Sequence, residues 1–145
     1  MKHDDIAGSL GKIFSLKYIL FNTFDTSPLQ LELNKTQERV LMMTWHHPGA
    51  TMQFLSREAG LEKGSLTTVI DSLEADGLVF RRRDERDKRS FTVMTTEEGV
   101  LLAERIESLF REHLDVLLAK LSPEERTAFA NAVQTMNRII PVLAS

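Results

Sequence analysis

Two helical patterns separated by Gly60 constrain the fold of this chain more than any other feature of its sequence. Apolar residues recur at helical spacing on both sides of this glycine. They are Met52, Leu55 and Ala59 before it, and Leu66, Val69, Ile70 and Leu73 after it. Two short amphipathic helices joined by a tight, glycine-containing turn make up a helix-turn-helix. The sequence therefore predicts this motif, with helices over 52–58 and 63–76 that bury these apolar residues.

A charged hairpin follows the second helix directly. Gly77 ends that helix, and two short runs of β-type composition, 78–83 and 90–95, enclose the charged residues 84–89. A segment with so many charges is costly to bury, so we expect it at the exposed tip of a hairpin. A helix-turn-helix followed by a basic two-stranded ribbon is a winged helix. We therefore predict a mainly α-helical fold with a small β-hairpin wing.

Charge is distributed unevenly over this motif. The whole chain carries a net charge of −3, which by itself argues against a nucleic-acid partner. Between residues 78 and 89, however, six basic residues stand against three acidic ones. The second helix is different, because Lys63 stands there against the acidic residues Glu62, Asp71, Glu74 and Asp76. The electrostatic case for binding DNA therefore depends on the wing.

The residues that form these features resemble the MarR family of bacterial transcriptional regulators. The most specific parts of the resemblance are the aspartate-arginine wing, 84–89, and the threonine-glycine start of the next helix, 95–99. Shorter matches lie in the rest of the motif: His47-Pro48-Gly49, Leu55-Ser56, Ala59-Gly60-Leu61, Ile70-Asp71-Ser72-Leu73-Glu74 and Gly77-Leu78-Val79-Phe80-Arg81. Together the motifs cover about a third of the chain.

The resemblance implies a function and a set of DNA contacts. MarR-like regulators are homodimers that bind palindromic double-stranded DNA, with a recognition helix of each subunit in successive major grooves and the wings in the flanking minor grooves. We therefore expect a sequence-specific transcriptional regulator, namely a repressor that a small molecule releases. The expected DNA-binding residues are Lys63, Ser65, Thr67, Thr68 and Ser72 in the recognition helix, and Arg81, Arg86, Lys88 and Arg89 in the wing.

Two aspartates of the wing also bear on this interface. We expect Asp84 and Asp87 to orient the wing arginines through charge-assisted hydrogen bonds, since an arginine in a narrow groove must be held there. The positions of Thr68 and Ser72, by contrast, are often arginine in the family. This departure leaves the bound sequence open. An acidic, hydroxyl-rich recognition helix also supports one alternative, a winged-helix module that binds a protein and has little affinity for DNA.

Composition excludes several other classes of function. The chain has no cysteine, which rules out disulfides and cysteine nucleophiles and is compatible with a reducing cytoplasm, where we expect the protein to act. It also lacks a Gly-rich phosphate loop and a His/carboxylate cluster at ligand spacing, so we predict no enzymatic activity and no cofactor.

His46 and His47 are adjacent and point about 100° apart on a helix, which is unsuitable for one metal ion. The apolar stretch 13–24 is interrupted by polar residues, which favours a buried helix or a subunit interface over a membrane anchor.

Long helical patterns flank the winged helix. We expect one MarR-like domain in which residues 34–96 form a DNA-binding lobe, while residues 1–33 and 97–145 form a helical dimerisation lobe. The first helix is predicted to run to about residue 24 and the long helix after the wing to about Leu121. The apolar surface of the first helix is equally compatible with burial in its own core and with a partner subunit.

Capping signals mark where the helices start and stop. A side-chain acceptor followed three residues later by Glu or Gln can form a capping box. Three such pairs are predicted: Asn34 with Gln37, Thr95 with Glu98, and Ser122 with Glu125. Further N-caps are expected at Thr51 and at Asp4 or Asp5. Pro123 suits the first turn of the last helix, and Pro141 should end that helix.

Regulation by a small molecule is expected because thiol chemistry is excluded. Some MarR-like proteins sense peroxides through a cysteine, and this chain has none. A small aromatic or carboxylate effector, bound where the dimerisation helices meet the winged helix, would instead fix the two lobes at a spacing unsuited to DNA. The candidate lining residues are Phe14, Tyr18, Phe21, Trp45, His46 and His113. For His113, packing in a core or interface is the competing interpretation.

Overall fold

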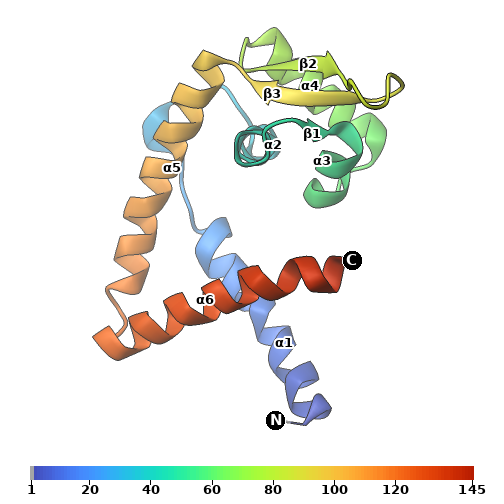
Figure 1. Cartoon of the computed structure of the whole chain (residues 1–145). Coiled ribbons are helices and arrows are strands. Elements are labelled where there is room, and N and C mark those ends of the chain that lie inside the picture. Colours follow the sequence, from blue (N-terminus) through green and yellow to red (C-terminus); the bar gives the residue numbers. More distant parts are fainter. Residues whose placement is uncertain (1) are drawn as a thin grey trace. The chain divides into compact units, whose positions relative to one another are not determined.

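The computed structural model describes residues 2–145, apart from the side chains of His3 and Asp4. The described residues form two compact units (Figure 1). Residues 26–108 make up the winged-helix unit, and residues 2–25 together with 109–145 make up the terminal unit. The two units are described separately below.

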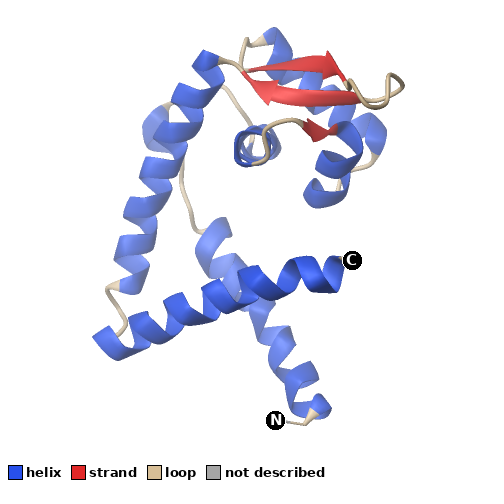
Figure 2. Cartoon of the chain, viewed as in Figure 1, coloured by secondary structure: helices blue, strands red, loops and turns tan. Residues whose placement is uncertain are grey.

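The winged-helix unit contains the predicted helix-turn-helix and wing (Figure 2). After a 3₁₀ turn, Ser27–Leu29, come α2 (Lys35–His46), β1 (Ala50–Thr51), α3 (Met52–Ala59), α4 (Lys63–Ala75), β2 (Val79–Arg83), β3 (Phe91–Thr95) and the start of α5 (Glu97–Leu118). The sheet is antiparallel in the order β1-β3-β2. Its third strand, β1, was not predicted, because two residues are too few to produce an alternating pattern.

A single apolar core holds this unit together. Fully buried side chains come from every helix of the motif and from the sheet, and include Leu41, Leu55, Leu66, Ile70, Leu73, Val79 and Val93. The helix α4 packs against α2, α3 and β2, which fixes which of its faces remains outside. One expected core residue, Val69, is only half-buried, because it lies at the edge of the buried face of α4.

Two of the three predicted capping boxes are confirmed. Asn34 accepts a hydrogen bond from the backbone N–H of Gln37 at 2.8 Å, and the Gln37 side chain accepts one from Asn34 N at 2.7 Å. Ser122 and Glu125 make the same pair of bonds at the start of α6, where Pro123 takes the first helical position. Thr51 also caps α3 as predicted.

The third predicted box, Thr95 with Glu98, is wrong by one residue. Thr96 is the residue that caps α5, since its hydroxyl accepts from the N–H of Gly99 at 3.0 Å and donates to Gly77 O at 2.6 Å. The chain is very tight at this point. A Cβ at Gly99 would lie 2.0 Å from the carbonyl oxygen of Leu78, so only glycine fits there.

The terminal unit consists of helices alone. The first, α1 (His3–Lys17), continues into a π-helical turn, Tyr18–Asn22, and is preceded by Lys2, so neither Asp4 nor Asp5 is its N-cap. The second half of α5 belongs to this unit and ends at Leu118, short of the predicted end. The last helix, α6 (Pro123–Ala144), passes through Pro141, contrary to prediction. A proline one turn from a helix end removes a single hydrogen bond, which the remaining turn tolerates.

None of the helices in the described part of the chain combines the length and hydropathy needed to cross a membrane.

Candidate nucleic-acid interface

The outward face of α4 is built from small side chains. Leu66, Ile70 and Leu73 are buried, so the helical period directs the opposite face of α4 away from the core. The residues on this exposed face follow one another at steps of four, three and four: Gly64, Thr68, Asp71 and Ala75. This row is called the outward ridge below. A Cβ at Gly64 would meet nothing within 4 Å, so the helix start is open to a partner. Small side chains allow the helix backbone to come close to whatever it binds.

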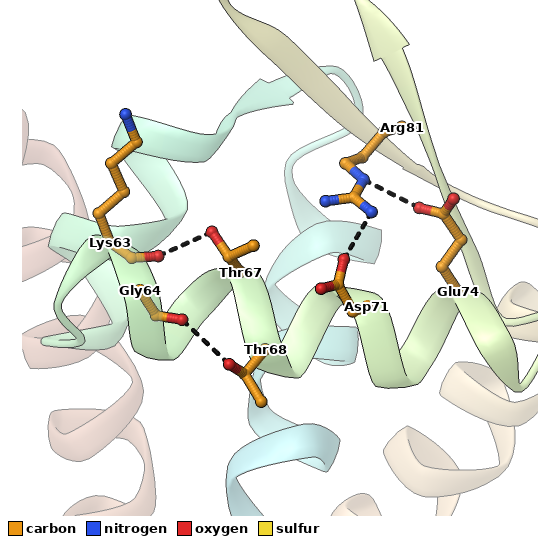
Figure 3. A network of polar contacts seen from close by, with 7 residues as sticks. All are labelled: Lys63, Gly64, Thr67, Thr68, Asp71, Glu74 and Arg81. Carbon is orange, nitrogen blue, oxygen red and sulfur yellow. Dashed lines mark hydrogen bonds and ion pairs between the residues drawn. The ribbon is translucent and has the colours of Figure 1, made fainter.

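The two threonines on α4 donate their hydroxyl protons to hydrogen bonds within the helix. Thr67 Oγ1 donates to Lys63 O at 2.9 Å, and Thr68 Oγ1 donates to Gly64 O at 3.1 Å (Figure 3). Each hydroxyl therefore offers a partner only acceptor lone pairs, beside its methyl group. The other predicted residues at the start of the helix, Lys63 and Ser65, are exposed.

Arg81, which was predicted to contact DNA, is engaged by two carboxylates of α4 (Figure 3). Its Nη2 lies 2.6 Å from Asp71 Oδ1 and its Nε lies 3.0 Å from Glu74 Oε2. Burial works against the charged guanidinium, but the bond to Asp71 and the charges of Glu74 and Asp71 outweigh it and raise the pKa of Arg81 above its ordinary value. This network joins the first strand of the wing to α4 and offsets part of the acidity noted in the sequence.

Ser72 is also engaged within the protein. The side-chain amide of Gln37 donates to Ser72 Oγ at 2.6 Å, so the hydroxyl lies at the margin between α4 and α2. Gln37 therefore has two roles, since its oxygen caps α2 and its nitrogen holds α4. The capping box predicted only the first role, because residues 35 positions apart in sequence cannot be paired by a local pattern.

The wing tip is held by its aspartates through the backbone. Asp84 Oδ1 accepts from the N–H of Arg86, and Asp87 Oδ1 accepts from the N–H of Arg89, each at 3.0 Å. These are Asx-turns, which a carboxylate forms with the backbone two residues on. Among the ion pairs of residues 2–145, none joins these carboxylates to a guanidinium. The two aspartates thus shape the loop, while the side chains of Arg86, Lys88 and Arg89 are exposed.

Arg83 braces the hairpin, a role that was not predicted from the sequence. Its Nη1 donates to Lys88 O at 2.6 Å, and its guanidinium lies 5.3 Å from the ring centroid of Phe91. Phe91 is the cross-strand partner of Arg83 in the register of β2 and β3. The sequence contains one indication of this role. An arginine ends the first strand of the hairpin and an aromatic residue begins the second, and cation–π attraction favours such a pair.

Comparison with known proteins identifies the family. The MarR family model matches residues 33–91, the segment that contains the winged helix. The organic hydroperoxide resistance transcriptional regulator of Bacillus subtilis (strain 168) is 32% identical over 111 residues, which cover 75% of this chain and 74% of the relative. The chain belongs to the MarR family. It is accordingly a DNA-binding transcriptional regulator and not an enzyme.

Solved structures share the fold. The chain is similar to Streptococcus pneumoniae FabT in complex with DNA, with a TM-score of 0.67 and 19% identity over 98% of this chain and 99% of that one. It is also similar to the PcaV transcriptional regulator of Streptomyces coelicolor in complex with its natural ligand, with a TM-score of 0.59 and 23% identity over 89% of each chain. At these identities the likeness shows the fold.

The predicted effector residues of this MarR-family chain are divided between the two units. Phe14 and Tyr18 are exposed on the first helix, and Phe21 stacks on Phe110 with ring centroids 5.5 Å apart. His113 belongs to the same unit, where its Nε2 lies 3.1 Å from Leu20 O. This contact, within the terminal unit, agrees with the packing interpretation of that histidine.

The other two predicted effector residues, Trp45 and His46, lie at the end of α2 in the winged-helix unit. Their rings are 4.8 Å apart, and His46 Nε2 lies 3.5 Å from Glu107 Oε1 on α5. Across the described residues, no three His, Asp or Glu side chains gather closely enough to hold a metal ion.

Proposed function

We propose that this MarR-family regulator is a homodimeric repressor that binds a palindromic operator and is released by a small-molecule effector. The observation that carries the proposal is the pairing of exposed wing cations, Arg86 and Arg89, with the uncovered small outward ridge of α4. A ridge of this kind fits the floor of a major groove, and cations on a narrow hairpin fit the adjacent minor groove. FabT, solved with DNA, has the same fold.

Dimerisation is supported by the apolar surface of the terminal unit. Large apolar side chains on α1 and its π-helical turn are exposed, and so are several on α6: Ile6, Leu10, Ile13, Phe14, Tyr18, Ile19, Phe21, Ile139, Ile140, Val142 and Leu143. A surface of this kind is unfavourable in water and marks an interface. A second copy of the chain is the partner we propose, because a two-fold dimer matches a palindromic operator.

Operator binding is tested by comparing the wild type with an Arg86→Ala/Arg89→Ala variant on DNA from the regulator's own promoter. If both arginines enter the minor groove, each change should weaken binding by roughly 1 to 3 kcal/mol. The slope of log affinity against log salt should also fall by about 0.9 for each phosphate that the variant no longer neutralises. Arg105→Ala, which removes an exposed charge from α5, serves as the control and should leave affinity unchanged.

Unchanged affinity in the double variant would exclude the wing as a DNA contact. Absence of wild-type binding to any DNA at low salt would instead favour the alternative, a protein-binding winged helix, for which the carboxylates Asp71 and Glu74 on α4 are the supporting observation.

Release by a small aromatic or carboxylate effector is supported by the lack of any cysteine, since peroxide sensing through a thiol is excluded. PcaV, which shares the fold, was solved with its natural ligand. Candidate phenolic and carboxylate compounds can be titrated against the preformed DNA complex while the fluorescence of Trp45, the single tryptophan, is followed. DNA release by such a compound is expected. Reversible release by peroxide, with no response to any of these compounds, would contradict the proposal.

A further inference from the structure

The outward ridge of α4 presents hydrogen-bond acceptors and methyl groups. The hydroxyl proton of Thr68 is donated to Gly64 O, and Asp71, paired with Arg81, offers a partner its carboxylate oxygens as acceptors. Lys63, at the first position of α4, is the one cationic side chain of this helix, and no arginine, asparagine or glutamine lies further along it to supply the donors that usually read guanine or adenine. The base edge that faces the centre of this helix must therefore supply the donor.

Asp71 is the residue best placed to accept that bond. Its side chain is 56% exposed, and only Oδ1 is engaged by Arg81. Within residues 2–145, no group donates a hydrogen bond to Oδ2. Arg81 reaches Asp71 from β2 and bonds one of its two carboxylate oxygens (Figure 3). The orientation of Asp71 is therefore set within the protein before any DNA is bound.

Arg81 also lowers the electrostatic obstacle to an acid in a DNA groove. An isolated carboxylate among phosphates is repelled, and the guanidinium that Asp71 and Glu74 share offsets part of that repulsion. Glu74, the second partner of Arg81, lies one turn further along α4 and to the flank of the ridge. It shares the neutralising contact without facing outward.

We propose that Asp71 is a specificity-determining residue that accepts a hydrogen bond from the N4 amino group of a cytosine in each operator half-site. This inference rests on the proposed operator binding by α4. Cytosine is selected because its major-groove edge offers a donor and no acceptor. Adenine places N7 beside its amino group, while guanine and thymine present acceptors, all of which repel a carboxylate. Arg81 acts as a positioning residue for this contact.

The experiment is selection of binding sites from random DNA, followed by affinity measurement with each of the four bases at every position of the selected site. It is performed with the full-length wild type and with Asp71→Asn and Glu74→Gln. The two variants form a matched pair, since each removes one carboxylate partner of Arg81 while only Asp71 lies on the ridge. Thermal unfolding confirms that both variants fold.

The wild type should select a cytosine at one position of each half-site and discriminate against other bases there by roughly 5-fold or more. Asp71→Asn should lose this preference at that position alone, and Glu74→Gln should retain it. If Asp71 only anchored Arg81, both variants would weaken binding to all sequences alike and leave the base preference unchanged, which would overturn the inference. A wild type that selects no sequence at all would instead refute the proposed function.

Discussion

The two units of the chain differ in where they place their apolar side chains. Every buried hydrophobic residue in the described chain belongs to the winged-helix unit, from Val40 to Ile106. The terminal unit has none among its described residues, and it exposes Phe14 at 77% and Leu143 at 80%. Its helices are nevertheless long and regular, with α6 spanning 22 residues.

This difference shows that one unit closes a core on itself while the other needs a surface to cover it. Burial of apolar area is the main favourable term in folding, so we expect helices that bury no side chain fully in their own unit to depend on a partner for much of their stability. We therefore expect the winged-helix unit to be stable by itself and the order of the terminal unit to depend on the proposed dimerisation.

A charge introduced on the exposed terminal helices should abolish dimerisation. In Phe14→Asp/Ile140→Asp, association would bury unpaired carboxylates in an apolar interface, at a cost of about 5 kcal/mol or more per dimer. Sedimentation at micromolar concentration should show a monomer. Leu101→Asp, a change of an equally exposed residue in the winged-helix unit, is the control and should remain dimeric. A dimer in the double variant would mean that another surface makes the interface.

A cavity in the core of the winged-helix unit should lower the free energy of unfolding by about 2–5 kcal/mol. Leu73→Ala removes a side chain that is 0% exposed, so the loss should be seen in urea unfolding at every protein concentration. Ile139→Ala, on α6, should act through the dimer, and its effect should depend on protein concentration. If the two variants behaved alike, the contrast between the units would not hold.

Gly99→Ala should destabilise the protein by about 1–3 kcal/mol, because the new methyl group would overlap the backbone carbonyl of Leu78. Thermal unfolding measures the loss. Gly64→Ala is the matched control, since its methyl group would enter open space on α4 and should be neutral or stabilising by up to about 1 kcal/mol. Equal melting temperatures for the two variants would show that the junction between Leu78 and α5 can relax.

The smallest effect should come from the helix caps, at about 1 kcal/mol each. Asn34→Ala and Ser122→Ala each remove a side-chain acceptor from a capping box, one in either unit. Loss of Asn34 should lower global stability, since α2 is packed into the core. Loss of Ser122 should appear mainly as faster hydrogen exchange in the first turn of α6. If hydrogen exchange at the start of α2 and at the start of α6 responded identically to the two changes, the two units would not differ in local stability.

The sequence predicted most of the fold because its signals are local. The helix spacing around Gly60, the cap at Thr51 and the charged tip 84–89 each depend on residues within a few positions of one another, and the structure confirms these elements. The errors lie where distant residues meet. The start of α5 is set at Thr96 by the close approach of Gly99 to Leu78, which no pattern in residues 95–98 contains.

For the candidate site, the sequence predicted which side chains are exposed better than it predicted which groups they contact. Exposure of Arg86, Lys88 and Arg89 follows from charge alone. The engagement of Arg81 by Asp71 does not, because two residues ten positions apart, one on a strand and one on a helix, meet only once the core has positioned both elements. The aspartates of the wing are a similar case. Their spacing from the arginines was evident, but whether a carboxylate bonds the backbone or the guanidinium depends on the turn that the hairpin adopts.

By itself, the amino-acid sequence determined the class of fold, the family resemblance, the placement of positive charge on the wing and the exclusion of thiol chemistry. These follow from residue type and short-range spacing, which folding does not alter. Tertiary packing set the remaining properties: the acids of α4 pair with Arg81, the outward ridge consists of small and acceptor groups, and no described side chain of the terminal unit is fully buried within that unit. Those properties depend on which faces the core leaves uncovered, and that is settled when distant segments pack together.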